Sequence, residues 1–302
     1  MEERVTASNR VTSTDGTELA VAQFGDPADP TIICVHGYPD NRTVWNPVAS
    51  RLSEKFHVVT YDVRGAGESG KPSRRSDYLI EQLNADLGAV ADEVSPNAPV
   101  HLLAHDWGSI QTWEAVTGNI PASRIASYTS ISGPSLDQAG VWLRGMNWSD
   151  PRTIPPRLLQ LVESYYVWFF QTPRLPEAAW KAGLVDRLLA QTSRIGRPPG
   201  VTPDEVARTD ADRINGIELY RANVMPRLTR PNPRRTSVPV QVIAPTKDIY
   251  VSHPLATQAP VPYVADLRVV TVDGGHWIVL DQPGLIADQV TSFITGLTTW
   301  AG

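Results

Sequence analysis

Three residues of the types used in covalent hydrolysis occur in the order aspartate, aspartate, histidine. They are Asp106, Asp248 and His276, and each follows closely on a run of apolar residues. An aspartate is ionised at neutral pH and attacks carbon without the help of a base. A histidine that is oriented by a second carboxylate can activate water. This set of residues could therefore form an alkyl ester and then hydrolyse it.

Asp106 stands between the apolar run Val100–Ala104 and a stretch with a helical pattern. A sharp strand-to-helix turn between small residues, here Ala104 and Gly108, is typical of a nucleophile elbow, which forces the side chain at its apex out above the sheet. The alternative is that Asp106 caps the helix that follows, because aspartate is a preferred N-cap residue. We favour the elbow because partners for it occur elsewhere in the chain.

Those partners are two loops and an acid. The segment His36–Pro39 follows an apolar run, and the backbone N–H groups of Tyr38 and Trp107 would form an oxyanion hole beside the elbow. Asp248 would orient His276, whose flanking glycines let its loop reach Asp106. The alternatives are an ordinary strand-to-helix turn, a turn-forming aspartate and a solvated loop histidine.

The elements that must position these residues follow from the pattern of the chain. Short β-branched runs alternate with longer amphipathic stretches, which is typical of a mostly parallel sheet with crossover helices. Residues 9–24 alternate around a central Asp-Gly pair and predict a hairpin. Strands are expected at 31–35, 57–61, 100–104, 126–131, 238–244 and 267–272, and helices at 82–94, 107–118 and after Pro283.

The interval 134–236 differs from the rest because it is rich in proline and shows no strand pattern. Its segments 157–171, 176–192 and 212–224 predict helices. A helical block inserted between two strands predicts a cap over the carboxyl edge of the sheet, where open α/β sheets bind ligands. The expected division is a core of residues 1–133 and 237–302 with a cap of residues 134–236. Tryptophans in the cap are Trp142, Trp148, Trp168 and Trp180.

With the order nucleophile, acid, histidine, the chain resembles the α/β-hydrolase superfamily over residues 10–300. Within it, the chain is similar to epoxide hydrolases of the actinobacterial type. The motifs that carry this resemblance are His36–Pro39, Asp62–Ser69, His105–Gly108, Asp248 and Gly275–Trp277. The resemblance implies an α/β-hydrolase fold with a mostly parallel, eight-stranded sheet. Residues 130–135 are similar to the members in which a reductase domain follows, and no such domain is expected here.

In epoxide hydrolases two cap tyrosines donate to the epoxide oxygen. The segment Tyr165–Pro173 resembles the first tyrosine segment, with Tyr166 the better match and Tyr165 the alternative, and Leu219–Asn223 resembles the second, which implies Tyr220. For either position the alternative is an amphipathic core residue. The side chains expected to contact substrate are His36, Pro39, Tyr165, Trp168 and Trp277.

The resemblance implies conversion of an epoxide to a vicinal diol through an ester of Asp106, and the aromatic cap suggests an apolar epoxide. Haloalkane and haloacetate dehalogenases use the same nucleophile and are the alternative. Many haloalkane dehalogenases have asparagine in place of Tyr38, and haloacetate dehalogenases typically have arginines near the nucleophile, where Trp107 stands here. A third alternative is a ligand-binding protein without activity. A serine esterase is disfavoured because the chain contains no Gly-x-Ser-x-Gly segment.

Composition excludes other classes. The chain has 302 residues, a net charge of −5 and interspersed charges, which disfavours nucleic-acid binding. It contains no apolar run of the roughly 20 residues that a membrane helix needs. Residues 1–9 lack the apolar run of a secretion signal, which predicts a cytoplasmic location. No cofactor and no metal is expected, since His101 and His105 flank a strand instead of sharing a helix face. The expected partners are an epoxide substrate and water, with a homodimer left open.

Overall fold

The computed structural model describes residues 7–147, 149–204 and 206–298. Trp148, one of the tryptophans expected in the cap, lies outside the described residues. So do residues 1–6, which form part of the segment from which the absence of a secretion signal was expected. No helix in the described ranges combines the length and the apolar character needed to cross a bilayer.

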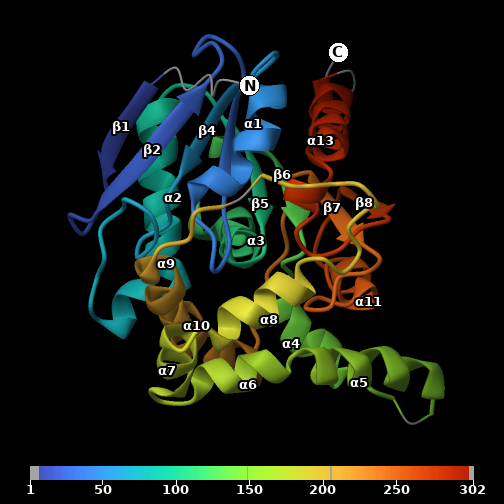
Figure 1. Cartoon of the computed structure of the whole chain (residues 1–302). Coiled ribbons are helices and arrows are strands. Elements are labelled where there is room, and N and C mark those ends of the chain that lie inside the picture. Colours follow the sequence, from blue (N-terminus) through green and yellow to red (C-terminus); the bar gives the residue numbers. More distant parts are fainter. Residues whose placement is uncertain (1–6, 148, 205, 299–302) are drawn as a thin grey trace.

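An eight-stranded sheet runs through the molecule in the order β1-β2-β4-β3-β5-β6-β7-β8 (Figure 1). β1 and β2 form an antiparallel hairpin, β2 is antiparallel to β4, and all other neighbours are parallel. This confirms the predicted hairpin and the mostly parallel sheet. The strands are β1 Ala7–Thr12, β2 Glu18–Phe24, β3 Thr31–Val35, β4 His57–Tyr61, β5 Val100–His105, β6 Ile125–Ile131, β7 Val240–Pro245 and β8 Leu267–Val272.

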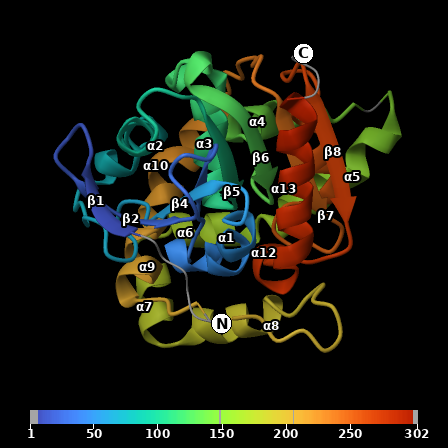
Figure 2. The same ribbon diagram turned by 90° about the horizontal axis from the view of Figure 1, so that it is seen from above.

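The two faces of the sheet are covered by different helices, and successive residues of one strand serve both faces. Ile33 and Val35 of β3 belong to the core that α2 (Ile80–Val94) and α3 (Trp107–Glu114) close. Ile32 and Cys34 belong to the core beneath α1 (Asn46–Leu52) and α13 (Pro283–Thr298). Figure 2 shows α2 and α13 on opposite sides of the sheet. Burial on both faces explains why these strands appear as continuous apolar runs.

Between β6 and β7 the described chain forms helices that lie below the sheet in Figure 1. They are α4 Leu136–Arg144, α5 Ile154–Glu163, α6 Tyr165–Gln171, α7 Leu175–Lys181, α8 Leu184–Thr192, α9 Asp210–Asn215 and α10 Ile217–Thr229. The remaining helices are α11 His253–Gln258 and α12 Ile278–Asp281, with short turns at Arg42–Trp45, Arg75–Tyr78, Ala115–Asn119, Ala122–Arg124 and Pro151–Thr153.

Each of the three helices expected in this interval is interrupted once. At Ser164 both the backbone N–H and the hydroxyl donate to the Gln160 carbonyl, at 2.9 and 2.7 Å, and a side-chain bond of this kind often bends a helix. Gly183 adopts a φ of 69°, which ends one helix and starts the next. Gly216 separates α9 from α10. The apolar periodicity continues across these residues, which is why it predicted single helices.

A buried ion pair joins the loop after β4 to α2. The Arg64 guanidinium donates to both carboxylate oxygens of Asp86 at 2.6 Å and to Asp15 at 2.9 Å. Burial raises the pKa of Asp86, although Arg64 opposes this shift. Removing the cation would leave the Asp86 charge buried with the Ser13 hydroxyl beside it but without its counter-charge.

We therefore expect Arg64→Met to lower the free energy of unfolding by about 3–5 kcal/mol. The matched control is Arg10→Met, because the Arg10–Glu18 pair is exposed and should contribute less than about 1 kcal/mol. Urea denaturation of both variants checks the prediction, and equal losses of stability would contradict it.

Candidate active site

Asp106 lies between the end of β5 and the start of α3. Its backbone has a φ of 53° and a ψ of −124°, a conformation that residues other than glycine rarely adopt. Asp106 occupies the N-cap position of α3, but its side chain makes no capping hydrogen bond. One carboxylate oxygen instead accepts the Tyr38 N–H at 2.7 Å, and the other lies 3.4 Å from Nε2 of His276. The helix-cap alternative is wrong for this residue.

Two glycines allow the close packing around the elbow. A Cβ atom at Gly108 would collide with the carbonyl oxygen of Val35, and one at Gly37 would collide with the Asp106 carboxylate. The first glycine lets α3 approach β3, and the second lets the loop after β3 lie against the nucleophile. Any larger residue at either position would push the Tyr38 N–H away from Asp106.

His276 and Asp248 complete the set predicted from the sequence. Nδ1 of the buried His276 lies 3.0 and 3.1 Å from the two oxygens of Asp248. One of these oxygens also accepts the N–H groups of Tyr250 and Val251, at 2.9 and 3.1 Å. The acid is therefore held in place by the backbone, and it in turn orients the imidazole.

The electrostatics of this set favour an imidazolium facing a carboxylate. Burial lowers the pKa of His276, but the charge of Asp248 and hydrogen bonds with Asp106 and Asp248 outweigh burial and raise this pKa to about 10. For Asp248, burial raises the pKa and the charge and hydrogen bonds of His276 lower it further, so its pKa lies below the usual value. These interactions therefore favour the protonated form of His276 beside the Asp106 carboxylate.

This shift has a consequence for stability. Because the pKa of His276 rises from 6.5 to about 10 on folding, its contribution is fully present below pH 6.5 and is lost as the pH rises through about 10. We expect the difference in unfolding free energy between the wild type and His276→Gln to shrink across this range. Denaturation curves of both proteins at each end of the range measure this difference. A difference that does not change with pH would contradict the prediction.

Two neighbouring groups fix the loop that carries His276. Nε2 of the buried His105 lies 2.8 Å from the His276 carbonyl oxygen and must be the donor, and the two rings are 4.9 Å apart. The Trp277 indole N–H donates to Asp40 at 3.1 Å. Trp277 is thereby tied to the loop that carries Tyr38.

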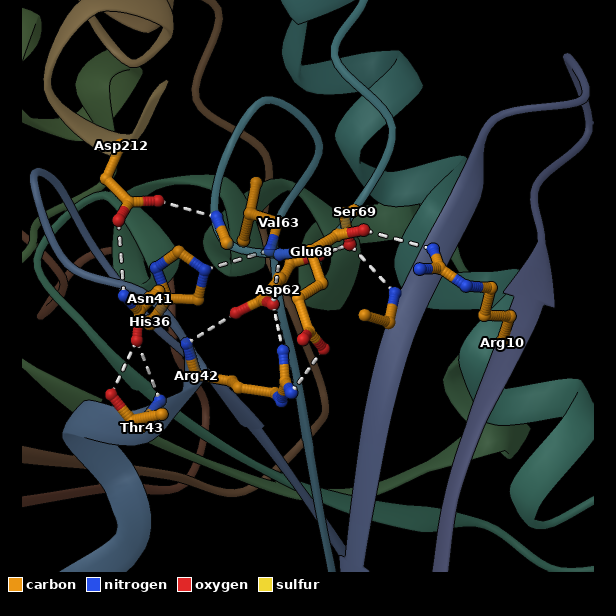
Figure 3. Close-up of polar contacts among 12 residues, drawn as sticks. Arg10, His36, Asn41, Arg42, Thr43, Asp62, Val63, Glu68, Ser69 and Asp212 are labelled. Carbon is orange, nitrogen blue, oxygen red and sulfur yellow. Dashed lines mark hydrogen bonds and ion pairs between the residues drawn. The ribbon is translucent and has the colours of Figure 1, made fainter. Parts of the chain in front are cut away.

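The Tyr38 loop is held from both sides by a polar network (Figure 3). Asp62 accepts the backbone N–H of Arg42 at 2.8 Å and pairs with its guanidinium. Asp212, from α9, accepts the Gly67 N–H at 2.5 Å and the Asn41 amide at 3.2 Å. The motif residues Asp62–Ser69 therefore serve to position loops.

The structure does not place His36 at a substrate. Its Nε2 accepts the Val63 N–H at 2.8 Å, so Nδ1 carries the proton that it shares with the Gly37 carbonyl oxygen at 2.8 Å. Both ring nitrogens are used, and the buried ring does not line the cavity described below. The expectation that His36 contacts substrate is wrong, because the residue closes a loop instead.

A cavity of about 340 Å³ opens above Asp106. Its walls are mainly aromatic and aliphatic, and its polar groups are Asp106, His276 and phenol hydroxyls. The lining residues are Tyr38, Pro39, Asp106, Tyr165, Tyr166, Phe169, Phe170, Ala179, Trp180, Leu184, Val185, Leu188, Leu189, Tyr220, Tyr250, His276 and Trp277. Such a site suits an apolar ligand that carries a single polar reacting group.

Tyr166 and Tyr220 converge in this cavity, with ring centroids 6.0 Å apart. Burial raises the pKa of both phenols well above the usual value, and the charge of Asp106 adds to both shifts. A hydrogen bond with Trp107 partly offsets the shift of Tyr220. The Tyr166 hydroxyl has no hydrogen-bond partner among residues 7–147, 149–204 and 206–298. Both phenols therefore keep their protons at neutral pH in the cavity that Asp106 also lines.

The other residues expected at the substrate have different positions. Pro39 and Trp277 line the cavity, whereas Tyr165 lies at its edge with 55% of its surface exposed. Trp168 does not line the cavity and is 59% exposed, so its expected contact with substrate is wrong. It occupies the outer face of α6, since periodicity alone does not tell an inner aromatic residue from an outer one.

Two aromatic contributions were missed from the sequence. Tyr250 lines the cavity, and its ring centroid lies 4.8 Å from that of His276 and 5.3 Å from that of Tyr166. The sequence contained one signal for Tyr250, which is its position two residues after Asp248. An aspartate side chain commonly accepts the backbone N–H of the residue two positions later, as Asp248 does here. The Tyr38 hydroxyl donates to the Arg213 carbonyl and accepts the Trp180 indole N–H, both at 2.7 Å. This links the loop after β3 to α7 and α9.

Comparisons with known proteins agree with this architecture. The family model of the alpha/beta hydrolase fold matches residues 30–283. A Mycobacterium tuberculosis protein named probable oxidoreductase EphD is 32% identical over 296 residues, which cover 95% of this chain and 49% of that protein. The chain thus spans about half the length of this relative. Epoxide hydrolase A of the same species is 26% identical over 96% of this chain and 98% of its own length.

Among solved structures, a mutant of an epoxide hydrolase from Bacillus megaterium, complexed with its product, aligns with a TM-score of 0.78. It is 20% identical and covers 95% of this chain and 100% of its own. At this identity the likeness shows the fold. The sheet order, the elbow at Asp106 and the family match over residues 30–283 lead to one conclusion: the chain belongs to the α/β-hydrolase fold family.

Proposed function

We propose that this protein is an epoxide hydrolase that converts an apolar epoxide to a vicinal diol through an ester of Asp106. The observation that carries the proposal is the shared cavity, in which the side chain of Asp106 at an elbow lies with two phenols whose pKa values are raised. The names of epoxide hydrolase A and of the Bacillus megaterium structure support this assignment.

The proposal includes a cap formed by residues 134–236 on a core of residues 1–133 and 237–302. Support comes from the cavity, because its lining from α6, α7 and α8 faces Asp106 and His276 of the core. The Tyr38 hydroxyl and the Asp212 carboxylate bridge the two parts. The cap would supply the proton donors and exclude water from the first step.

In the first step, a carboxylate oxygen of Asp106 attacks one carbon of the epoxide ring and forms an ester. The ring C–O bond breaks, and its electron pair remains on the departing oxygen. Tyr166 and Tyr220 donate hydrogen bonds to this oxygen, and one of them transfers its proton. An alkoxide is a stronger base than a phenolate, so the transfer is favourable even though the pKa of both phenols is raised.

Ester formation changes the charge around His276. The neutral ester no longer supplies the Asp106 charge and hydrogen bond that help to raise the pKa of His276 in the free enzyme. The pKa of the imidazole falls, so the imidazolium loses its proton while the strongly basic phenolate regains one. His276 is then neutral and can take a proton from water, and Asp248 stabilises the imidazolium that forms.

In the second step, this water attacks the carbonyl carbon of the ester. The Tyr38 N–H already donates to an oxygen of Asp106 in the free enzyme and would stabilise the oxyanion. The N–H of Trp107 belongs to the first turn of α3, has no partner within the helix, and would be the second donor. Collapse of the intermediate breaks the ester C–O bond. The departing oxygen takes the proton of the hydroxyl that was added, which releases the diol and restores the carboxylate of Asp106.

The route can be tested by single-turnover hydrolysis in water enriched in the heavy oxygen isotope. Because water attacks the ester carbonyl, we expect the isotope to appear in Asp106 after one turnover and not in the diol. Mass spectrometry of the peptide that contains Asp106 checks this. Label found only in the diol would exclude the ester route. Halide release from haloalkanes or haloacetates, without turnover of epoxides, would instead support a dehalogenase.

A further inference from the structure

An extended apolar surface covers the helices farthest from the sheet. It is formed by the consecutive helices α5, α6, the start of α7 and α8, which are at the lower end of the molecule in Figure 1. We call it the outer apolar face; its residues are Leu158, Leu159, Leu161, Val162, Tyr165, Trp168, Leu175, Leu184, Leu188 and Ile195. Their exposed fractions range from 42% for Ile195 to 71% for Val162. Large apolar side chains exposed on several consecutive helices are a feature of interaction sites.

The spacing of these residues places them on common helix faces. Leu158 and Val162 of α5 are four residues apart, as are Leu184 and Leu188 of α8. On the inner side of α6 and α8, Tyr166, Phe170 and Leu189 pack in or against the core. The outer side is therefore an unpartnered face of otherwise packed helices.

The cavity opens into this face. Tyr165, Leu184 and Leu188 line the cavity and are also 55%, 56% and 43% exposed. Residues that satisfy both conditions lie at the mouth. An apolar molecule bound on the outer apolar face would thus reach Asp106 without crossing a polar surface.

Exposed cations border the same helices. Arg174, Lys181, Arg187 and Arg194 are exposed and form no ion pair with any residue in the described part of the chain. Residues 134–236 contain 15 Lys and Arg against 10 Asp and Glu, a net charge of +5, whereas the rest of the chain carries 12 against 22, a net charge of −10. Positive charge therefore gathers on the segment that exposes the apolar residues.

We propose that the outer apolar face binds the surface of an anionic phospholipid bilayer, with the mouth of the cavity against the lipid. Exposed leucines and a tryptophan beside unpaired cations are the features by which interfacial helices enter the headgroup region. Charge disfavours a second copy of this chain as the occupant, because two such faces would bring like charges together.

Binding to the bilayer in this orientation would also indicate where the substrate comes from. Resting on the proposed function, it implies that the epoxide is lipid-soluble and enters the cavity from the bilayer in which it is dissolved. The polar diol would then leave toward water. Binding to the bilayer itself requires no turnover and can be measured separately.

Flotation of the purified chain with vesicles tests the proposal. We expect binding to vesicles of phosphatidylcholine mixed with phosphatidylglycerol and much weaker binding to phosphatidylcholine alone. The double variant Leu158→Asp/Val162→Asp, at exposed positions outside the cavity lining, should lower the partition coefficient by about tenfold or more. Arg187→Glu/Arg194→Glu should lower it similarly, because each cation near an anionic surface raises binding by about fivefold.

Matched controls are Val261→Asp and Lys55→Glu, which change an exposed apolar residue and an exposed cation outside this face. Both should bind like the wild type. Failure of the wild type to bind phosphatidylglycerol vesicles, or equal binding by all variants, would overturn the proposal. So would a dimer in analytical ultracentrifugation that Leu158→Asp/Val162→Asp dissociates. Turnover of a water-soluble epoxide without vesicles tests the proposed function independently, so the two can fail separately.

Discussion

Replacing His276 by glutamine is expected to produce a protein that reacts with epoxide once and then stops. Glutamine cannot take a proton from water, so the ester on Asp106 should form but not hydrolyse. Steady-state turnover should fall by about 10³-fold or more, within the range for loss of a general base. The mass of the intact protein should increase by that of the epoxide, and peptide mapping should locate the increase at Asp106.

The control for this experiment is His253→Gln, at a histidine that contacts Thr271 and does not line the cavity. It should turn over normally and show no adduct. Normal turnover by His276→Gln would contradict the assignment of His276 as the base. Loss of turnover without an adduct would contradict the ester on Asp106, provided that the variant is folded.

Replacing Tyr166 and Tyr220 together by phenylalanine should slow ring opening by about 10²–10⁴-fold, because the departing oxygen loses both proton donors. The single variant Tyr220→Phe should lose about 10²-fold or less, since the second phenol remains. Rapid-quench measurement of ester formation separates this step from the hydrolysis of the ester, which uses neither phenol.

Tyr165→Phe is the matched control, because Tyr165 is adjacent in sequence but lies at the exposed edge of the cavity. It should retain nearly full activity. A larger loss in Tyr165→Phe than in Tyr166→Phe would exchange the two roles. If the double variant lost no activity toward epoxides, the phenols would not be the acids, and a leaving group that needs no proton would become the better assignment.

Much of the fold was predictable because its signals are local. β3 and β4 are buried along their whole length, so they appear as uninterrupted apolar runs whose limits match the predicted strands. Helix interruptions were not predictable in the same way. At Ser164 the bond from the hydroxyl to the Gln160 carbonyl leaves no mark on the apolar periodicity, so one helix was expected where two exist.

Whether a single side chain has its predicted role depends on the hydrogen-bond partners and the packing space that neighbouring residues offer it. His36 belongs to a matching motif, but the Val63 N–H and the Gly37 carbonyl use both of its nitrogens. Trp168 was expected to face the substrate, but it faces outward because the inner side of α6 is occupied by Tyr166 and Phe170. Neither outcome can be read from the identity of the residue.

The sequence by itself determined the position of Asp106 at a strand-to-helix turn, its order with Asp248 and His276, and the sheet that carries them, because turns, glycines and apolar runs act over a few residues. Only the tertiary structure decided what surrounds Asp106. The pKa of His276, the convergence of Tyr166 and Tyr220, and the opening of the cavity into an apolar, cationic face depend on contacts between distant segments. These contacts depend on close packing of the interior, because the position of each side chain is limited by the volume and the hydrogen-bonding groups of its neighbours.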